Sequence, residues 1–291
     1  MEESVVNKKE WTKEEIEFLK QNHEKLSRKD MSEKLNRTRS SVQNKCNKLG
    51  LKTKSKYYYN QDYFENIDTE DKAYWLGFIF ADGYISVNPE TRNWELGIEL
   101  STKDKKHLQK FNKSLNGNIA IKDTVRDKTN DDFIKANFTY ASRIRIYSKK
   151  MTTDLIKLGI SNCKTYHEFG LPSIEKKLII PFIRGFFDGD GCVGLEKNRS
   201  CLRCDFCSVN LQFLNEIRDF LFQNYNIKSY ISTEGKKYKS TIPCYRLYIR
   251  GLNNSYNFCK LLYDNSQIFL DRKKDKYEKI VNDYNILERI S

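Results

Sequence analysis

Two segments of the sequence share one pattern: AYWLGFIFADGYIS at residues 73–86 and PFIRGFFDGDGCVG at residues 181–194. Each is apolar nearly all round at helical spacing, and a helix of this kind has to be buried. Small residues recur four apart on one face of each segment, beginning at Gly77 and Gly185. Such faces let two helix backbones approach closely. The pattern predicts two buried helices that pack in parallel, with their C-terminal ends side by side.

Each predicted helix ends in an aspartate followed by glycine, and the two aspartates are Asp82 and Asp190. An aspartate in a last turn faces the negative end of the helix dipole at a cost of about 0.3–1 kcal/mol, and two adjacent ends add carboxylate repulsion. A divalent cation offsets both costs, and Mg²⁺ favours one or two carboxylates, water and a substrate phosphate. The two ends therefore predict a metal site suited to phosphodiester hydrolysis. We expect Gly83 and Gly191 to form left-handed helix caps.

The two segments begin two repeats, residues 66–177 and 178–291, in which the same order of elements follows. Apolar residues alternate where strands are predicted and recur at 3.6-residue spacing where helices are predicted. The strands include residues 94–100, 143–148 and 245–250, and the helices cover residues 104–115, 151–160, 210–224 and 252–263. We predict an α+β fold of two αββαββα units fused into a pseudo-dimer, because two long repeats do not form a stack.

The N-terminal residues 1–55 predict a separate domain of three short helices, followed by a linker at residues 56–65. Capping-box patterns that begin at Thr12 and Ser27 start the first two helices, and Thr38 precedes the third. One side of the third helix is polar, and its side chains can hydrogen-bond base edges and phosphates. The residues predicted to contact DNA from this domain are Arg37, Arg39, Ser40, Gln43, Asn44 and Asn47.

Basic and aromatic side chains alternate with apolar ones in two of the predicted strands, and a basic hairpin precedes the second. Alternation places them on one face of a sheet, opposite the face that packs on the core. Such a face can read base edges in the major groove. The residues predicted to contact DNA from the repeats are Arg143, Arg145, Tyr147, Lys236, Lys237, Lys239, Arg246, Tyr248 and Arg250.

Lys and Arg outnumber Asp and Glu by 52 to 39, and the net charge of +13 favours a polyanionic partner. The sequence begins without an apolar secretory segment, and its longest apolar run is far shorter than the ~20 residues that cross a bilayer. We therefore expect a cytoplasmic protein without membrane contact, whose cysteines are reduced. Cys201, Cys204 and Cys207 lie in a predicted strand, where residues three apart face opposite sides, so we assign them to sheet packing rather than zinc. No P-loop or G-x-G-x-x-G pattern occurs in the sequence, so no nucleotide cofactor is expected.

The stretches WLGFIFADG at residues 75–83 and IRGFFDGDG at residues 183–191 resemble the two motifs of single-chain LAGLIDADG homing endonucleases. The resemblance implies a pseudo-symmetric saddle of two four-stranded antiparallel sheets in the major groove of double-stranded DNA. It implies a monomer that cuts both strands at a specific site with Mg²⁺ or Mn²⁺. The N-terminal domain resembles the helix-turn-helix of homeodomain-like and Myb-like proteins.

The resemblance also implies roles for single residues. The metal ligands fall on Asp82 and Asp190, with Ala81 and Gly189 beside them in the metal site, and the catalytic basic residues fall on Lys164 and Lys273. Arg272 and Lys274 compete with Lys273 for its assignment. Asp188 has Phe80 as its counterpart in the first motif, so we do not expect a metal ligand there but an ion pair with Arg184 at i−4.

Two other functions fit a basic surface on the same scaffold: a DNA-binding regulator that does not cut, and an RNA-splicing maturase. Neither needs two carboxylates at the helix ends. The aspartate at both positions therefore favours cleavage.

Overall fold

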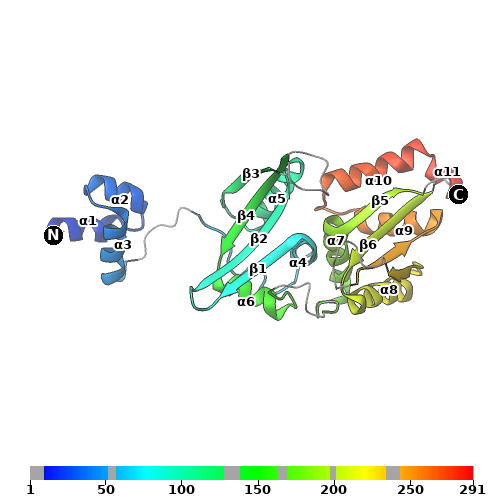
Figure 1. Cartoon of the computed structure of the whole chain (residues 1–291), viewed down its shortest axis with the longest axis horizontal. Coiled ribbons are helices and arrows are strands. Elements are labelled where there is room, and N and C mark those ends of the chain that lie inside the picture. The colour runs from blue at the N-terminus through cyan, green and yellow to red at the C-terminus, as the bar shows by residue number, and fades with distance from the viewer. Residues whose placement is uncertain are drawn as a thin grey trace. The chain divides into compact units, whose positions relative to one another are not determined.

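The chain divides into two compact units, Met1–Tyr58 and Tyr59–Ser291, and each has its own hydrophobic core (Figure 1). The computed structural model describes residues 10–51, 57–127, 138–162, 169–196, 201–233 and 243–290. Among these residues, no helix has both the length and the apolar character that a membrane span requires.

The first unit contains α1 (Lys13–Asn22), α2 (Arg28–Lys34) and α3 (Arg39–Lys48). Both predicted capping boxes are present, and the Thr38 side chain caps α3 by accepting from the Ser41 N–H. Caps of this kind satisfy amide groups that the first turn leaves without an intrahelical partner. The three helices pack around a small hydrophobic core, which consists of Leu19, Met31, Val42 and Cys46. The three predicted helices are confirmed.

The second unit carries the two repeats and two further helices at its C-terminus. The first repeat contains α4 (Glu70–Asp82), β1 (Gly83–Asn88), β2 (Asn93–Ser101), α5 (Lys105–Ser114), β3 (Ile121–Asp127), β4 (Phe138–Tyr147) and α6 (Lys149–Lys157). The second contains α7 (Ile179–Asp190), β5 (Gly191–Leu195), β6 (Leu202–Ser208), α8 (Leu211–Tyr225), β7 (Tyr230–Thr233), β8 (Tyr245–Ile249) and α9 (Leu252–Tyr263), followed by α10 (Asp271–Asp283) and α11 (Ile286–Ile290). The predicted αββαββα order is confirmed in both repeats.

Each repeat forms one four-stranded antiparallel sheet, and the strand orders correspond: β1-β2-β4-β3 and β5-β6-β8-β7. Ile144 and Ile146 of β4 are buried, whereas Tyr147 is 58% exposed. One face of the sheet therefore packs on the core and the other is open, as the alternation predicts.

Helices α4 and α7 lie side by side between the two sheets (Figure 1). A Cβ placed on Gly77 would lie 1.9 Å from the carbonyl oxygen of Phe182, and one placed on Gly185 would lie 1.9 Å from that of Tyr74. Farther along, a Cβ on Gly189 would meet the Ala81 methyl group. Gly77 and Gly185 thus mark one crossing point, and Ala81 and Gly189, each four residues farther along its own helix, meet next, so the helices are parallel. Glycine is required because the two backbones touch.

The predicted left-handed caps at the ends of α4 and α7 are wrong. Gly83 has φ −81° and ψ 160°, and Gly191 has φ −84° and ψ 165°, so both are extended and start β1 and β5 directly. A Cβ on Gly83 would lie 2.6 Å from the Ile79 side chain, and one on Gly191 would lie 2.3 Å from the Phe187 ring. The glycines permit a tight turn from helix to strand against the preceding turn of the helix.

Candidate functional site

Asp82 and Asp190 end the two parallel helices, and the structure brings these ends together. A Cβ on Gly189, the residue before Asp190, would lie 3.3 Å from the Asp82 carboxylate oxygen. Asp82 is half-buried and Asp190 is exposed. Neither helix has a basic residue in its last turn, so the carboxylates and the helix dipoles place negative charge at one point.

The described residues supply a small set of oxygen ligands at this point. Among them, no group of three or more His, Cys, Asp and Glu side chains could hold a metal ion by itself. Two carboxylates beside helix C-termini fit a hard cation that keeps waters and takes further oxygens from a phosphate, as Mg²⁺ does. A cavity of about 280 Å³ borders this point and is lined in part by Ala81 and Asp190.

Lys273 approaches the same helix ends from the first turn of α10. Its Nζ donates to the carbonyl oxygens of Phe187 at 2.5 Å and Gly189 at 3.2 Å. Burial lowers the pKa of the Lys273 ammonium to about 8, although the charges of Asp188, Asp82 and Asp190 oppose this change. An amine with this pKa exchanges its proton near neutral pH, which suits proton transfer. The two neighbouring basic side chains that could take the place of Lys273 point to other partners. Arg272 pairs with Asp104 at 2.8 Å, and Lys274 lies near Glu278 at 3.9 Å.

Asp188 is fully buried and accepts three hydrogen bonds. Its donors are the Tyr263 hydroxyl at 2.7 Å, the Tyr74 hydroxyl at 2.8 Å and the Leu270 backbone N–H at 2.7 Å. The ion pair predicted between Asp188 and Arg184 is wrong, because side chains four apart on α7 point to different neighbours here. Burial raises the pKa of Asp188, and the charge of Lys273 and these hydrogen bonds oppose the rise.

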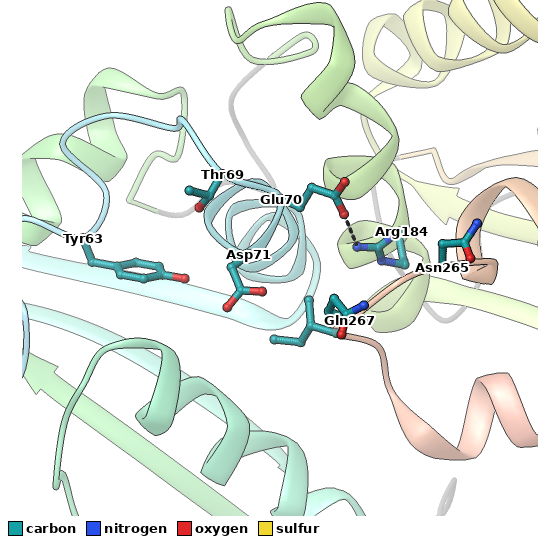
Figure 2. Close-up of a pocket in the computed structure, with 8 residues that line it drawn as sticks. Tyr63, Thr69, Glu70, Asp71, Arg184, Asn265 and Gln267 are labelled. Carbon is teal, nitrogen blue, oxygen red and sulfur yellow. Dashed lines mark ion pairs between the residues drawn. The ribbon is translucent and has the colours of Figure 1, made fainter.

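Arg184 lines a separate pocket of about 640 Å³ near the N-terminal end of α4 (Figure 2). Its guanidinium donates to the Leu262 carbonyl oxygen at 3.0 Å and faces the Glu70 carboxylate at 3.8 Å. Burial lowers the pKa of this arginine. This pocket lies at the start of α4, whereas Asp82 is the last residue of the helix. The pocket is therefore not part of the site that contains the two aspartates.

The Asp188 network continues to a buried histidine on α5. The Tyr74 hydroxyl donates to Asp188 and lies 3.0 Å from His107 Nε2. Since that hydroxyl has one proton, His107 has to donate its Nε2–H to the tyrosine oxygen. Burial first, and then the charges of Lys110, Arg272 and Lys273, lower the pKa of His107 to about 3. The histidine is therefore neutral in the folded protein.

His107 is expected to make folding sensitive to acid. Its folded pKa of about 3 lies below the unfolded value of ~6.5, so the unfolded chain binds more protons between these limits. Stability is then full above pH 6.5 and falls by ~1.4 kcal/mol per pH unit as the pH drops through this window. His107→Gln keeps an N–H donor without the titration, so urea unfolding between pH 4 and 7 should show a smaller loss. His23→Gln, in the first unit, is the control, and an equal acid loss in wild type and His107→Gln would contradict the assignment.

The open face of the first sheet carries the predicted basic residues, and each lies beside an acid. Register places Arg145 opposite Gly97 and Arg143 opposite Glu99. Arg145 pairs with the nearly buried Glu95 at 3.1 Å, and Arg143 lies 3.7 Å from Glu99. These acids hold the guanidinium groups in place and reduce the positive charge of the face.

The second sheet repeats this arrangement. Arg246 donates to the buried Asp205 carboxylate at 2.5 Å. Tyr248 stacks on Tyr230 with ring centroids 5.2 Å apart, and the Arg250 guanidinium lies 4.5 Å from the Tyr248 ring. Both open faces therefore present ordered arginine and tyrosine side chains. Their contact with DNA stays a prediction, and Lys236, Lys237 and Lys239 lie outside the described residues, as does Lys164.

In the first unit, the predicted DNA-contacting residues divide into two groups. On α3, Arg39, Ser40, Asn44 and Asn47 are exposed and Gln43 is half-exposed. Arg37 differs: its side chain is 6% exposed, bonds to Glu15 at 2.8 Å and lies 4.2 Å from the centre of the Trp11 ring. Arg37 therefore fastens α1 to the loop before α3, and its contact with DNA stays a prediction.

The sequence reasoning missed the tyrosine and aspartate network and the acids under the arginines. Tyr74, Tyr263 and Asp188 lie far apart in the sequence, and each looks like part of an apolar helix. The position of Asp188 in an apolar helix could have indicated this network, because a buried carboxylate needs hydrogen-bond partners inside the protein. The alternation Glu95, Glu99 on β2 was also visible and predicts acids on the open face.

A family model described as a LAGLIDADG-like domain matches residues 69–167 and 177–263. A curated protein of Methanocaldococcus jannaschii, named probable translation initiation factor IF-2, is 27% identical over 220 residues, which cover 70% of this chain and 16% of that protein. This chain thus matches only a small part of that relative's length.

Several solved structures have a similar fold. The homing endonuclease I-WcaI, bound to its DNA recognition sequence, has a TM-score of 0.49 at 16% identity, with 74% of this chain and 91% of that chain covered. Mesophilic variants of the homing endonuclease I-DmoI give 0.45 at 18% identity, with 76% and 99% covered. Full-length DUF199/WhiA from Thermatoga maritima gives 0.44 at 17% identity, with 77% and 64% covered. The family model covers most of the second unit and includes both aspartate-bearing helices, so the chain belongs to the LAGLIDADG family.

Proposed function

We propose that this protein is a site-specific double-strand DNA endonuclease that uses a divalent cation, Mg²⁺ or Mn²⁺. The observation that carries the proposal is the convergence of Asp82 and Asp190 at two touching helix ends, with the Lys273 amine at the same place. A protein selected for stability alone would not place two carboxylates and two dipole ends together. Both carboxylates come from one chain, so we expect a monomer to suffice.

Asp82 and Asp190 would hold the cation and, through it, the phosphate of the DNA backbone. When bound, the cation supplies positive charge that polarises the phosphate and stabilises the charge that develops in the transition state. The Lys273 amine lies within the same helix ends and can hold or release a proton there, since its pKa is about 8. The open sheet faces would lie along the major groove, where arginines bond guanine edges and phosphates.

The direct test is cleavage of a randomised DNA library by the full chain with Mg²⁺, followed by sequencing of the ends. We expect double-strand breaks at one recurrent sequence, and none when EDTA replaces the cation. Tight binding to one sequence without breaks in Mg²⁺ or Mn²⁺ would instead identify a regulator. Specific binding to a structured RNA, with no breaks in DNA, would identify a maturase.

We further propose that α3 of the first unit reads DNA. Arg39→Ala in combination with Asn44→Ala is expected to weaken binding of the target by ~1–3 kcal/mol and to lower the slope of affinity against salt by about 1. Cleavage at saturating protein should persist, because the metal site is unchanged. Lys20→Ala removes one charge from α1 and is the control. Equal weakening in the control would place the DNA-binding surface elsewhere, and competition binding at several salt concentrations measures both quantities.

A further inference from the structure

The buried Asp188 carboxylate ties three elements to the end of α7. Its donors come from α4 (Tyr74), from α9 (Tyr263) and from the residue that precedes α10 (Leu270). Three donors from separate elements fix the carboxylate and also fix each element relative to it. The network lies two residues before Asp190, inside the protein rather than in the metal site.

Lys273 depends on this network through a short path. The backbone N–H of Lys273 donates to the Leu270 carbonyl oxygen at 3.0 Å, and the N–H of the same Leu270 donates to Asp188. The Lys273 Nζ bonds to the carbonyl oxygens of the residues on either side of Asp188, which are Phe187 and Gly189. Asp188 therefore anchors the first turn of α10 at the place where the ammonium has to reach back to α7.

The equivalent position of the first repeat carries no acidic side chain. Phe80 takes the place of Asp188, and its ring packs on Phe182, Phe169 and Phe213 with centroids 5.2, 5.3 and 6.3 Å away. Asp188 accepts a hydrogen bond from the Leu270 backbone N–H, and a phenyl ring cannot replace the carboxylate in such a bond. The two halves of the centre are thus built differently.

We propose that Asp188 is a positioning residue for DNA cleavage, which fixes the first turn of α10 and so holds the Lys273 ammonium at the end of α7 in one half of the centre only. The inference rests on the proposed endonuclease function. It requires that Asp188 act through Lys273, and that its loss affect the two DNA strands unequally.

A double-mutant cycle tests the first requirement. Asp188→Asn leaves one acceptor oxygen and adds donors that face other donors, so it breaks the network with little change of shape. We expect it to slow single-turnover nicking of one labelled strand about 10–100-fold, as loss of a supporting contact does, while the DNA Kd is unchanged. In the Lys273→Met background the same change should alter the rate by less than about twofold, because the group it positions is gone.

Hydrogen exchange gives a readout that needs neither DNA nor cation. The amides at the start of α10, from Leu270 to Lys274, should exchange faster in Asp188→Asn than in wild type, while those of α8 should not. Tyr263→Phe removes one donor and keeps the Leu270 contact, so it should give a smaller change of the same kind and serves if Asp188→Asn folds poorly. Ile217→Val, a buried change on α8, is the stability control.

Additive rate effects of Asp188→Asn and Lys273→Met would overturn the proposal, and so would equal slowing of both strands. Equal slowing in Ile217→Val would show that Asp188 matters only for global stability. If wild type cuts no sequence with Mg²⁺ or Mn²⁺, the proposed function fails, whereas the exchange measurement still tests whether Asp188 anchors α10.

Discussion

Asp82→Asn and Asp190→Asn are each expected to lower double-strand cleavage at least ~100-fold, because loss of several kcal/mol of charge stabilisation has this scale. Asparagine keeps the shape of the side chain and removes the charge that would hold the cation. DNA binding should persist, since the sheet faces and α3 are unchanged, and it should strengthen slightly as repulsion from phosphate declines. Single-turnover cleavage and DNA affinity measured on the same preparation separate the two effects.

Asp219→Asn is the matched control for this prediction, because Asp219 lies on α8 and its half-exposed side chain pairs with Arg218. It should cut DNA as wild type does. Undiminished Mg²⁺-dependent cutting by Asp190→Asn would show that the metal site is assigned wrongly. Loss of DNA binding in both variants would show instead that the aspartates support the fold.

Gly185→Ala is expected to destabilise the second unit by about 3 kcal/mol or more, at the upper end of the cost of overpacking. The new Cβ would lie 1.9 Å from the Tyr74 carbonyl oxygen and 2.8 Å from the Phe78 nitrogen, so the two helices have to separate. Separation would move Asp82 away from Asp190, and cleavage should fall together with the midpoint of urea unfolding.

Gly194→Ala provides the comparison on β5, where the nearest atom to a new Cβ is Arg203 Nε at 3.6 Å, an ordinary contact. Its unfolding midpoint should stay close to that of wild type. A Gly185→Ala protein as stable as Gly194→Ala would mean that α4 and α7 are not in backbone contact in solution.

The parts of the fold that depend on local patterns could be predicted from the sequence. Small residues four apart in an apolar helix predict a close helix pair, and Gly77 and Gly185 do lie at that contact. The capping spacings at Thr12 and Ser27 predict helix starts because their partners are three residues away. Alternation predicts which side of β4 is open because successive side chains in a strand point to opposite faces.

Features that depend on distant partners were predicted less well. Asp188 was expected to pair within its own helix, but its three donors come from residues 75 to 114 positions away. The partners of Arg37 were not predicted either: Glu15 of α1 and Trp11, which precedes α1, enclose its side chain. Helix α10 was not predicted, because its sequence is mostly charged and only a few residues, Lys273 among them, are buried. Periodicity and spacing carry no information on such contacts.

The contact between α4 and α7 also limits how the protein can change its sequence. At Gly77 and Gly185 the opposing atoms belong to backbone carbonyl groups of Phe182 and Tyr74, not to side chains. A larger residue at either glycine therefore cannot be accommodated by making a facing side chain smaller, which is the usual route for second-site suppressors in a core. Relief would require a shift of a whole helix, and that shift would carry Asp82 or Asp190 with it. In a genetic screen for restored cleavage, we therefore expect revertants of these two positions to restore glycine itself.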